Sequence, residues 1–474
     1  MTHSIDQVHV VVLAAGQGTR MKSRVPKVLH RISNLSLIEH VLRTAESVSP
    51  TSVTVIVGHG AESVRGELGN RPTLEFALQE PQLGTAHALQ QAESALSGRR
   101  GTLVLLSGDV PLLTPDTLRR LVETHRDANA AATVVTATVE RPYGYGRIVR
   151  ANGRIARIVE ERDASPAERR IREINSGIYA FDLEPLFEAL RGIASQNAQG
   201  EYYLTDLVGI YRRRKLAVET LHVQNSQEIR GINSRTELAE VSSLVRQKKN
   251  EELMAAGVTL VDPATTYIDS DVEIGPDTVI HPGVIIEGQS RIGSACEIHA
   301  HVRIVGSDVG DRVTIHNFCL IVGARVAPGA ALGPFAHLRP ESVVGEGAKV
   351  GNFVELKKTT LGPGSKASHL AYLGDATIGA NVNIGAGTIV CNYDGQKKSE
   401  TVIEDGAFIG SDTQLIAPVT VGQGAYVGTG TTVRENVPPG SLAVSAGKQR
   451  NIEGWVERKR GGASPAKAAS KPTA

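Results

Sequence analysis

An aliphatic residue recurs every six positions over the C-terminal half of the chain, from Ile268 to about Val437. A small or β-branched residue such as Val272 or Thr278 follows four positions later in most repeats. Neither the period of a helix nor the alternation of a single strand explains this spacing. A coil of short strands joined by tight corners does, with one large and one small side chain per side pointing inward. The pattern therefore predicts a parallel β-coil.

Three polar residues break this pattern, because Asp308, Arg325 and Asp394 stand where a small residue is expected, and each precedes a shift of the repeat. Asp394 lies inside residues 391–402 (CNYDGQKKSETV), a polar stretch without the repeat. Loops that project from a rigid scaffold often carry function. We therefore expect the interior positions to be scaffold, and the outward positions and this loop to carry the chemistry.

The N-terminal half has a different pattern, in which apolar runs alternate with helical periodicity. Strands are predicted at 8–15, 53–57, 74–78, 102–106 and 132–138, and helices at 85–96 and 115–125. Such alternation is typical of an α/β sheet with crossover helices, in which ligands bind at the carboxyl ends of the strands. A helical pattern from 235 to 256, ended by Gly257, predicts an arm between two domains.

Composition narrows the class of protein. A chain of 474 residues is long enough for two or three domains, and its net charge of +1 gives no reason to expect nucleic acid or an anionic membrane as partner. No apolar run reaches the length of a membrane span, and the N-terminus lacks a secretory pattern, so we expect a cytoplasmic protein. Three cysteines without a CxxC spacing indicate packing roles. The basic tail, residues 457–474, is expected to be disordered and solvated, with an anionic partner as the alternative.

A glycine-rich loop follows the first predicted strand. Gly16-x-Gly18 lets backbone N–H groups approach phosphate oxygens, but alone it is a weak signal. Together with Thr19-Arg20 and Pro26-Lys27 it resembles the signature of sugar-1-phosphate nucleotidyltransferases. In that reaction a sugar phosphate attacks the α-phosphorus of a nucleoside triphosphate, so positioning and charge neutralisation do most of the catalysis. Arg20 and Lys27 are suited to both tasks.

Asp109 comes directly after the buried strand TLVLLSG. Mg²⁺ prefers one or two carboxylates together with phosphate oxygens, so this is a candidate metal ligand. A turn or helix cap before Pro111 is the alternative, and it would be the better interpretation if the phosphate loop were absent.

Six further segments of the N-terminal half sharpen the resemblance: Gln79–Thr85, Gly108-Asp109, Gly144–Ile148, Ile158–Glu160, Glu173–Gly177 and Gly231–Asn233. In this order they resemble the family of bifunctional N-acetylglucosamine-1-phosphate uridyltransferases and glucosamine-1-phosphate acetyltransferases. The resemblance implies a Rossmann-like α/β nucleotidyltransferase domain and a role in the synthesis of UDP-N-acetylglucosamine for peptidoglycan. It also implies Mg²⁺ at Asp109 and Asn233, and nucleotide or sugar contacts from Leu13, Ala14, Ala15, Gly16, Lys27, Gln79, Gly84, Thr85, Gly146, Glu160, Asn175 and Asn233.

The β-coil resembles the left-handed parallel β-helix of hexapeptide-repeat acyltransferases, which implies a homotrimer with acyl-CoA between neighbouring coils. Of its histidines, His281, His299, His301, His316 and His337 are interpreted as surface residues. His369 is different, because Gly351–Lys358, His369–Asp375 and Asn381–Gly395 match the same bifunctional family. An amine must lose a proton to attack a thioester, and histidine suits that task.

By this resemblance His369 is the catalytic base. Glucosamine 1-phosphate would be bound by Arg339, Lys357, Tyr372 and Asn383, and acetyl-CoA by Ala386, Asn392, Tyr393, Ser411 and Thr429. Two positions depart from the family pattern: Thr429 replaces an expected alanine, and Ala446 replaces an arginine expected to meet CoA phosphates. Lys448, Arg450 or Trp455 are candidate substitutes.

The expected organisation is a uridylyltransferase domain at 1–234, a helical arm at 235–257, an acetyltransferase β-helix at 258–456 and the tail. The small-molecule substrates are glucosamine 1-phosphate, acetyl-CoA and UTP. One alternative is a nucleotidyltransferase with a structural or regulatory β-helix, as in glucose-1-phosphate adenylyltransferases. Another is a trimeric scaffold with a decayed nucleotidyl site. The group formed by His369, Lys357 and residues 391–402 argues against the first, and the intact Gly16–Lys27 loop against the second.

Overall fold

The computed structural model of the chain describes residues 7–69, 71–445, 447, 449 and 451–461. It divides into two units, described here one at a time. The first holds the chain up to Ala256 together with Thr266–Val272 and Ile286–Gly288, and the second holds the remainder.

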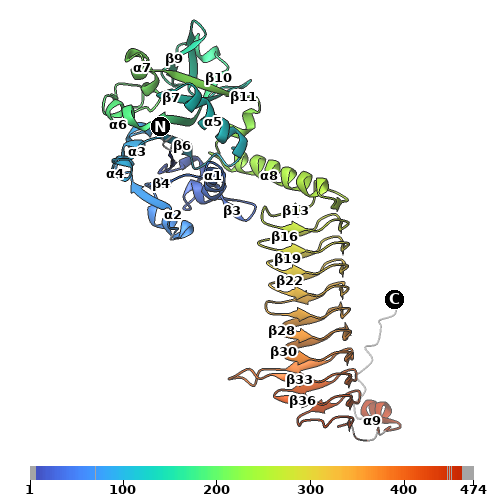
Figure 1. Ribbon diagram of the computed structural model, residues 1–474. Helices are drawn as coiled ribbons and strands as arrows, with labels where there is room; N and C mark the ends of the chain where they lie inside the picture. Colours follow the sequence, from blue (N-terminus) through green and yellow to red (C-terminus); the bar gives the residue numbers. More distant parts are fainter. Residues whose placement is uncertain (1–6, 70, 446, 448, 450, 462–474) are drawn as a thin grey trace, which may run out of the picture. The chain divides into compact units, whose positions relative to one another are not determined.

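The first unit is built on a nine-stranded sheet (Figure 1). Its strands are β1 (Val8–Ala14), β4 (Ser52–Val57), β5 (Leu74–Leu78), β6 (Thr102–Ser107), β7 (Ala132–Thr138), β8 (Arg147–Ala151), β9 (Arg154–Val159), β10 (Glu173–Asp182) and β11 (Val218–Val223). The strand order is β11-β7-β10-β6-β1-β4-β5, with β1 parallel to β4 and β6, and β10 antiparallel to β6 and β7. Val10 and Val12 of β1 enter one apolar core and Val11 the other, so both faces of the sheet are covered.

The helices of this unit cover the two faces of the sheet or extend from it. They are α1 (Leu37–Glu46), α2 (Ala61–Leu68), α3 (Thr85–Gln90), α4 (Glu93–Leu96), α5 (Pro115–Asp127), α6 (Leu183–Arg191), α7 (Asp206–Arg213) and α8 (Arg235–Ala255). The single helix predicted at 85–96 is wrong: it is interrupted at Gln91 and Ala92, whose N–H groups bond to carbonyls three residues back. The helix predicted at 235–256 is present as α8.

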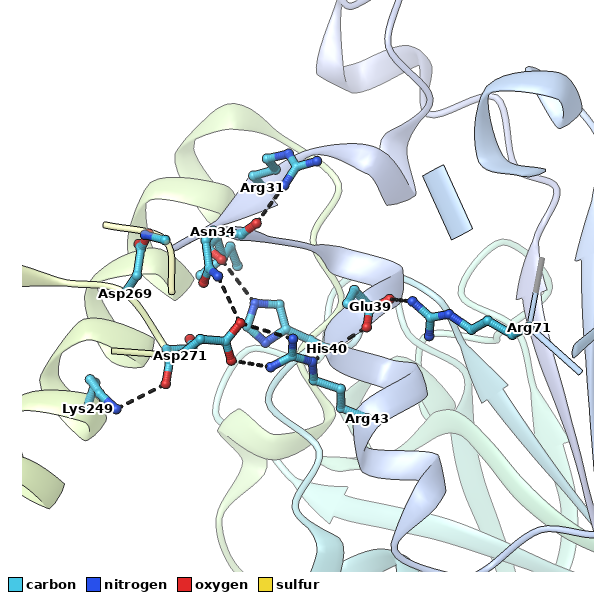
Figure 2. A network of polar contacts seen from close by, with 12 residues as sticks. Arg31, Asn34, Glu39, His40, Arg43, Arg71, Lys249, Asp269 and Asp271 are labelled. Carbon is cyan, nitrogen blue, oxygen red and sulfur yellow. Dashed lines mark hydrogen bonds and ion pairs between the residues drawn. The ribbon is translucent and has the colours of Figure 1, made fainter. Parts of the chain in front are cut away.

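A polar network fixes the segment that follows Lys27 (Figure 2). The hairpin β2 (Arg31–Ile32) and β3 (Leu35–Ser36) and helix α1 contact Asp271 of the first unit. Arg43 donates to both carboxylate oxygens of Asp271 at 2.5 and 3.1 Å, and Asn34 donates to it at 2.9 Å. These hydrogen bonds, above all those from Arg43, lower the pKa of Asp271. The network therefore holds the hairpin while this carboxylate is ionised.

The second unit is the expected parallel β-helix. One ladder of eleven strands runs from β12 (Thr259–Leu260) to β39 (Leu442–Ala443). Another ladder of seventeen strands runs from β13 (Tyr267–Ile268) to β38 (Thr432–Val433). Residues of its first strands are counted with the first unit. Each aliphatic residue of the six-residue repeat between Ile280 and Val433 is buried. Thr278 and Cys296 occupy small-residue positions of the interior and are 0 and 2 % exposed. The interior is therefore the scaffold that the six-residue period predicts.

The interruptions of the repeat have a simple structural cause. Asp308 and Arg325 are exposed at the starts of β20 (Asp308–Val309) and β23 (Arg325–Val326), and the preceding residues, Ser307 and Ala324, fill the interior positions instead. One residue fewer in these turns shifts the repeat. The segment between β32 (Ile389–Cys391) and β33 (Thr401–Ile403) leaves the coil as a hairpin (Figure 1), closed by an antiparallel bridge between Tyr393 and Lys398.

At the C-terminal end, helix α9 covers Trp455–Gly461. The disorder expected from residue 457 is therefore wrong for 457–461, which continue this helix, and residues 462–474 lie outside the described part of the chain. No helix among residues 7–69, 71–445 and 451–461 is long and apolar enough to cross a membrane.

Candidate active sites

The loop after β1 folds back on Lys27. Gly18 has a left-handed backbone (φ 60°), and a Cβ on it would lie 2.7 Å from the Cβ of Lys27. Only glycine meets both conditions, so this residue lets the loop close over the lysine. Lys27 begins the short helix η2 (Lys27–Leu29), and Arg20 is exposed in η1 (Thr19–Met21). Two cations thus lie on one loop beyond the carboxyl end of β1.

A second loop, residues 79–85, lies against the end of β1. Gln82 donates to the carbonyl of Ala15 at 2.8 Å, and the buried Gln79 donates to the carbonyl of Gly84 at 3.0 Å. Gly84 has φ 109°, and a Cβ there would lie 2.7 Å from the Tyr202 carbonyl, so a larger residue would push the loop open. The structure therefore brings Gln79, Gly84 and Thr85 to the loop that begins at Leu13–Gly16.

Asp109 and Asn233 converge on one cation, the ammonium of Lys27. Its Nζ is 2.5 Å from Asp109 Oδ2 and 3.2 Å from Asn233 Oδ1. Asn233 is positioned by the capping box of α8, in which Glu237 accepts from its backbone N–H at 2.6 Å and Ser234 caps the helix. A carboxylate and an amide oxygen within reach of one cation are a donor set that fits Mg²⁺. The residues present are therefore compatible with the expected metal.

The expected sugar-contacting residues lie together at the ends of β8, β9 and β10. A Cβ on Gly146 would lie 3.4 Å from Glu160 Oε1 and 3.5 Å from the Cβ of Asn175, and the backbone N–H of Asn175 donates to Gly146 O at 2.9 Å. Thr205 donates to Glu160 Oε1 at 3.1 Å. Burial raises the pKa of Glu160, and the negative charges of nearby carboxylates raise it as well. The hydrogen bond from Thr205 acts in the opposite direction but does not cancel the effect of burial. Among the described residues no cation is paired with Glu160, so its oxygen atoms can accept hydrogen bonds from hydroxyl groups.

Replacing Glu160 by glutamine should weaken binding of the sugar substrate but raise the stability of the fold at pH 8. A carboxyl group whose pKa is raised by folding stabilises the fold below its unfolded pKa, and this contribution is lost as pH rises through the folded pKa. Glu160→Gln should therefore melt at a higher temperature than wild type at pH 8, with the difference shrinking toward pH 4.5. Loss of the charged acceptor should raise KM for N-acetylglucosamine 1-phosphate roughly 10- to 100-fold.

Glu161→Gln is the matched control for this prediction. Burial opposes ionisation there too, but hydrogen bonds from Arg147 and Gly144 lower the pKa of Glu161. Its replacement should therefore lower the melting temperature at pH 8. Equal melting shifts of the same sign in both variants would contradict the assigned role of burial at Glu160.

In the second unit, His369 lies at the end of β29 (Lys366–His369) and is exposed. Its Nδ1–H donates to Asn352 Oδ1 at 2.7 Å, from the neighbouring turn of the coil. With Nδ1 as the donor, a neutral ring carries its lone pair on Nε2, which is the arrangement that a base requires. Backbone hydrogen bonding places Gly387 beside Leu370, so the segment with Ala386 adjoins the histidine.

Three residues of the second unit, Lys357, Asp375 and Asn392, form a polar cluster. Lys357 donates to both oxygens of Asp375 at 3.0 and 2.7 Å, and Asn392 donates to Asp375 Oδ2 as well. The hydrogen bond to Asp375 raises the pKa of Lys357. Burial opposes the ionisation of Asp375, but its hydrogen bonds to Lys357 and Asn392 lower its pKa. Asn392, from the projecting hairpin, is thereby fixed to the coil.

The other expected acceptor residues lie on or next to strands of the two ladders of the coil. Tyr372 begins β30 (Tyr372–Ile378) and lies opposite Glu355 of β28 (Glu355–Leu361), which accepts from Arg339 at 3.0 Å. Asn383 is half-buried at the start of β31 (Asn383–Ile384). Tyr372 and Arg339 thus both lie next to Glu355, Tyr372 as its partner in the β28–β30 pairing and Arg339 through an ion pair.

The expected acetyl-CoA residues are arranged as a column along successive turns. Ala386, Ser411 and Thr429 each follow a glycine, and a Cβ on Gly385 or Gly410 would lie 2.5 or 2.6 Å from the backbone of the next turn. Asp412 N–H donates to Ala386 O at 2.7 Å, and Gly430 N–H to Ser411 O at 2.9 Å. Tyr393 is 59 % exposed on the hairpin. Ala446, Lys448 and Arg450 lie outside the described residues, and Trp455 is exposed in α9.

Sequence reasoning assigned no role to Asn352, Asp375 or Lys398. Asn352 and His369 are 17 residues apart, as are Asp375 and Asn392, so the length of one coil turn was the signal that could have paired them. Lys398 lines a cavity of about 790 Å³ together with Lys358, Asp375 and Glu400. The hairpin thus supplies a further cation next to the Lys357–Asp375 pair.

Comparison with known proteins agrees with both units. Residues 10–198 match the MobA-like NTP transferase domain, and residues 271–306 and 400–435 match the bacterial transferase hexapeptide family. The Bifunctional protein GlmU of Trichlorobacter lovleyi is 49 % identical over 451 residues, covering 95 % of this chain and 98 % of that protein. The same protein of Syntrophotalea carbinolica is 50 % identical, covering 95 % and 97 %, and that of Geotalea uraniireducens is 47 % identical, covering 96 % and 100 %. With this identity over nearly its whole length, the chain belongs to the family of bifunctional GlmU enzymes.

Proposed function

We propose that the chain catalyses two consecutive reactions of UDP-N-acetylglucosamine synthesis and that the residues described above carry them. The β-helix domain, residues 258–456, acetylates glucosamine 1-phosphate with acetyl-CoA. The α/β domain, residues 1–234, then transfers uridylyl from UTP to N-acetylglucosamine 1-phosphate and releases pyrophosphate. Residues 235–257 form the arm between the domains. Membership of the bifunctional family supports both activities.

The observation that carries the acetyl half is the hydrogen bond from His369 Nδ1–H to Asn352. It orients the ring so that Nε2 can take a proton from the ammonium of glucosamine 1-phosphate, and the amine then attacks the thioester carbonyl. Lys357, whose charge is stabilised by Asp375, and Arg339 are the cations available for the substrate phosphate. A β-helix with a structural role alone would not require an oriented, exposed histidine.

In the uridylyl half, the loop from Leu13 to Gly16 together with Gln79, Gly84 and Thr85 would hold the uridine nucleotide. Glu160 and Asn175 would hold the hydroxyl and acetamido groups of the sugar. Arg20 and Lys27 would contact phosphate oxygens and stabilise the charge that develops as pyrophosphate leaves. Mg²⁺, held by Asp109 and Asn233, would neutralise the triphosphate.

A single reaction mixture tests this function. The purified full chain is supplied with glucosamine 1-phosphate, acetyl-CoA, UTP and Mg²⁺, and products are followed by mass. The proposal predicts free CoA, pyrophosphate and UDP-N-acetylglucosamine. Pyrophosphate release from added N-acetylglucosamine 1-phosphate without any acetyl transfer would instead favour a structural β-helix. Absence of both products would favour a scaffold.

A homotrimer is supported by an exposed ladder of apolar side chains along one corner of the coil. The corner ladder consists of His301, Phe318, Phe335, Phe353 and Leu370, at equivalent positions of successive turns. Neighbouring rings stack with centroids 5.0 to 5.3 Å apart, and the last four side chains are between 46 and 59 % exposed. A contiguous apolar stripe of this kind marks an interaction surface. Its end at Leu370, next to His369, would place a neighbouring chain at the acetyl site.

Charged substitutions in the corner ladder should dissociate the assembly. We expect Phe335→Asp combined with Phe353→Asp to sediment at one third of the wild-type mass and to lose most acetyl transfer, because burial of a carboxylate in an apolar contact is unfavourable. Uridylyl transfer should remain. Tyr267→Asp, at an exposed ring outside the ladder, is the matched control and should still assemble. An unchanged sedimentation coefficient in the double variant would contradict the proposed interface.

For the compartment we propose the cytoplasm. Cys296, Cys319 and Cys391 are all free thiols, and burial raises the pKa of Cys296 and that of Cys319, the latter to about 11. Thiols that stay protonated and buried in a coil interior are packing residues, and unpaired cysteines are typical of a reducing environment.

A further inference from the structure

Three side chains of the β-helix form a cluster separate from the two active sites described above. His281 directly follows β15 (Val279–Ile280), and Glu297 and His299 begin and follow β18 (Glu297–Ile298) on the next turn. The rings of His281 and His299 stack with centroids 4.9 Å apart and planes 13° apart. The coil thus presents two imidazoles in the same direction with a carboxylate between them.

The donor atoms of these residues lie close to one another. Glu297 Oε1 is 3.5 Å from His281 Nε2 and 3.6 Å from His299 Nε2, and all three atoms lie within 4.8 Å of one another. These separations are too long for strong hydrogen bonds. His281 Nε2 is moreover buried and has no hydrogen-bond partner in the described chain. A buried nitrogen left in this condition is unfavourable unless something else binds it.

We propose that His281, Glu297 and His299 bind one divalent transition-metal ion, with Zn²⁺ as the representative. Zn²⁺ binds imidazole nitrogen and carboxylate oxygen at about 2.0–2.2 Å, which in a tetrahedron separates ligand atoms by roughly 3.3–3.5 Å. The two distances to Glu297 are close to this value. Two imidazoles select such a metal over Mg²⁺, which prefers oxygen ligands.

A water molecule and His316 are the two candidates for the remaining coordination position. A water molecule can complete the tetrahedron, or His316 of the next turn can, because its ring stacks on His299 with centroids 5.1 Å apart. In either case the ion links residues of successive turns near the start of the coil. Its role is therefore to hold those turns together, and the site is independent of the proposed acetyl and uridylyl chemistry.

Cobalt(II) is a suitable probe, since it takes zinc sites and its visible absorption reports nitrogen and oxygen coordination. The chelator-treated full-length protein is titrated with Co²⁺ in excess Mg²⁺, which occupies oxygen-rich sites. We expect one equivalent per chain in wild type, in Asp109→Ala and in the control His337→Ala, a half-buried histidine on the same coil. His299→Ala and Glu297→Gln should each weaken binding by at least about 100-fold.

Melting temperature gives a second readout. Zn²⁺ should raise the melting temperature of wild type, because a ligand that binds only the folded chain stabilises it, and should not raise that of His299→Ala or Glu297→Gln. Retention of acetyl transfer in these variants, which rests on the proposed function, shows that the β-helix still folds. Equal Co²⁺ binding by His299→Ala and wild type, loss of binding in Asp109→Ala alone, or no stoichiometric binding by wild type would each overturn the proposal.

Discussion

Replacement of His369 by alanine is expected to lower acetyl transfer to glucosamine 1-phosphate by roughly 10²- to 10⁴-fold, the usual contribution of a positioned general base. Uridylyl transfer should stay at the wild-type level, because His369 lies in the second unit and the nucleotide loops lie in the first. The measurement is the initial rate of each half-reaction, with CoA release and pyrophosphate release followed separately. Without a base, the substrate ammonium keeps its proton and cannot attack the thioester.

Asn352→Ala is the matched variant for this experiment. It keeps the imidazole but removes the hydrogen bond to Nδ1, so the ring is free to turn and to change tautomer. We expect a smaller loss, on the order of 10-fold, with the pH profile of acetyl transfer shifted because an orienting partner of the base has gone. If His369→Ala abolished both half-reactions in a folded, assembled protein, the two sites would not be independent.

Replacement of Asp109 by alanine should have the opposite effect. Uridylyl transfer is expected to fall at least about 1,000-fold, which corresponds to about 4 kcal/mol of transition-state stabilisation. Acetyl transfer should not change. The reason is that Asp109 and Asn233 are the oxygen donors that converge at this site, and the remaining amide alone is a poor ligand for a hard cation.

The control for Asp109 is Asp116→Ala, which removes an exposed carboxylate from the first turn of α5 in the same unit. Both half-reactions should be retained in it. Loss of activity in Asp109→Ala could also come from Lys27, which loses its partner. The Mg²⁺ dependence separates the two causes. If Asp109 binds the metal, the variant should need a higher Mg²⁺ concentration for half-maximal uridylyl transfer. A lower maximal rate with an unchanged Mg²⁺ dependence would contradict a role in metal binding.

The β-helix could be predicted from sequence alone because its order is local and periodic. A large and a small interior side chain recur every six residues, so the pattern predicts the coil directly. The exceptions were harder to place. Asp308 and Arg325 looked like polar residues in interior positions, yet the shorter turns put Ser307 and Ala324 inside. A change in turn length is decided by backbone geometry, which the six-residue pattern does not contain.

The active-site residues were predicted in part. Lys27, Asp109 and Asn233 were singled out by motif, but that the lysine contacts both oxygens became visible only in the structure. Asn352 and Asp375 were not assigned a role, since each acts through a residue on a neighbouring turn. Their spacing of one turn is a weak signal unless the length of each turn is known.

By itself, the sequence determined the two architectures, and it predicted a phosphate loop at Gly16–Lys27 and a role for His369 that the other coil histidines do not share. These depend on periodicity and on short motifs, whose residues are neighbours in the chain. Only the tertiary structure decided which side chains meet across turns and loops. In the sequence His281 and His299 were interpreted as surface residues and Glu297 had no assigned role. The three become a candidate metal site because stacking of coil turns brings their donor atoms within 4.8 Å. Long-range convergence of this kind depends on the whole backbone, which no local pattern specifies.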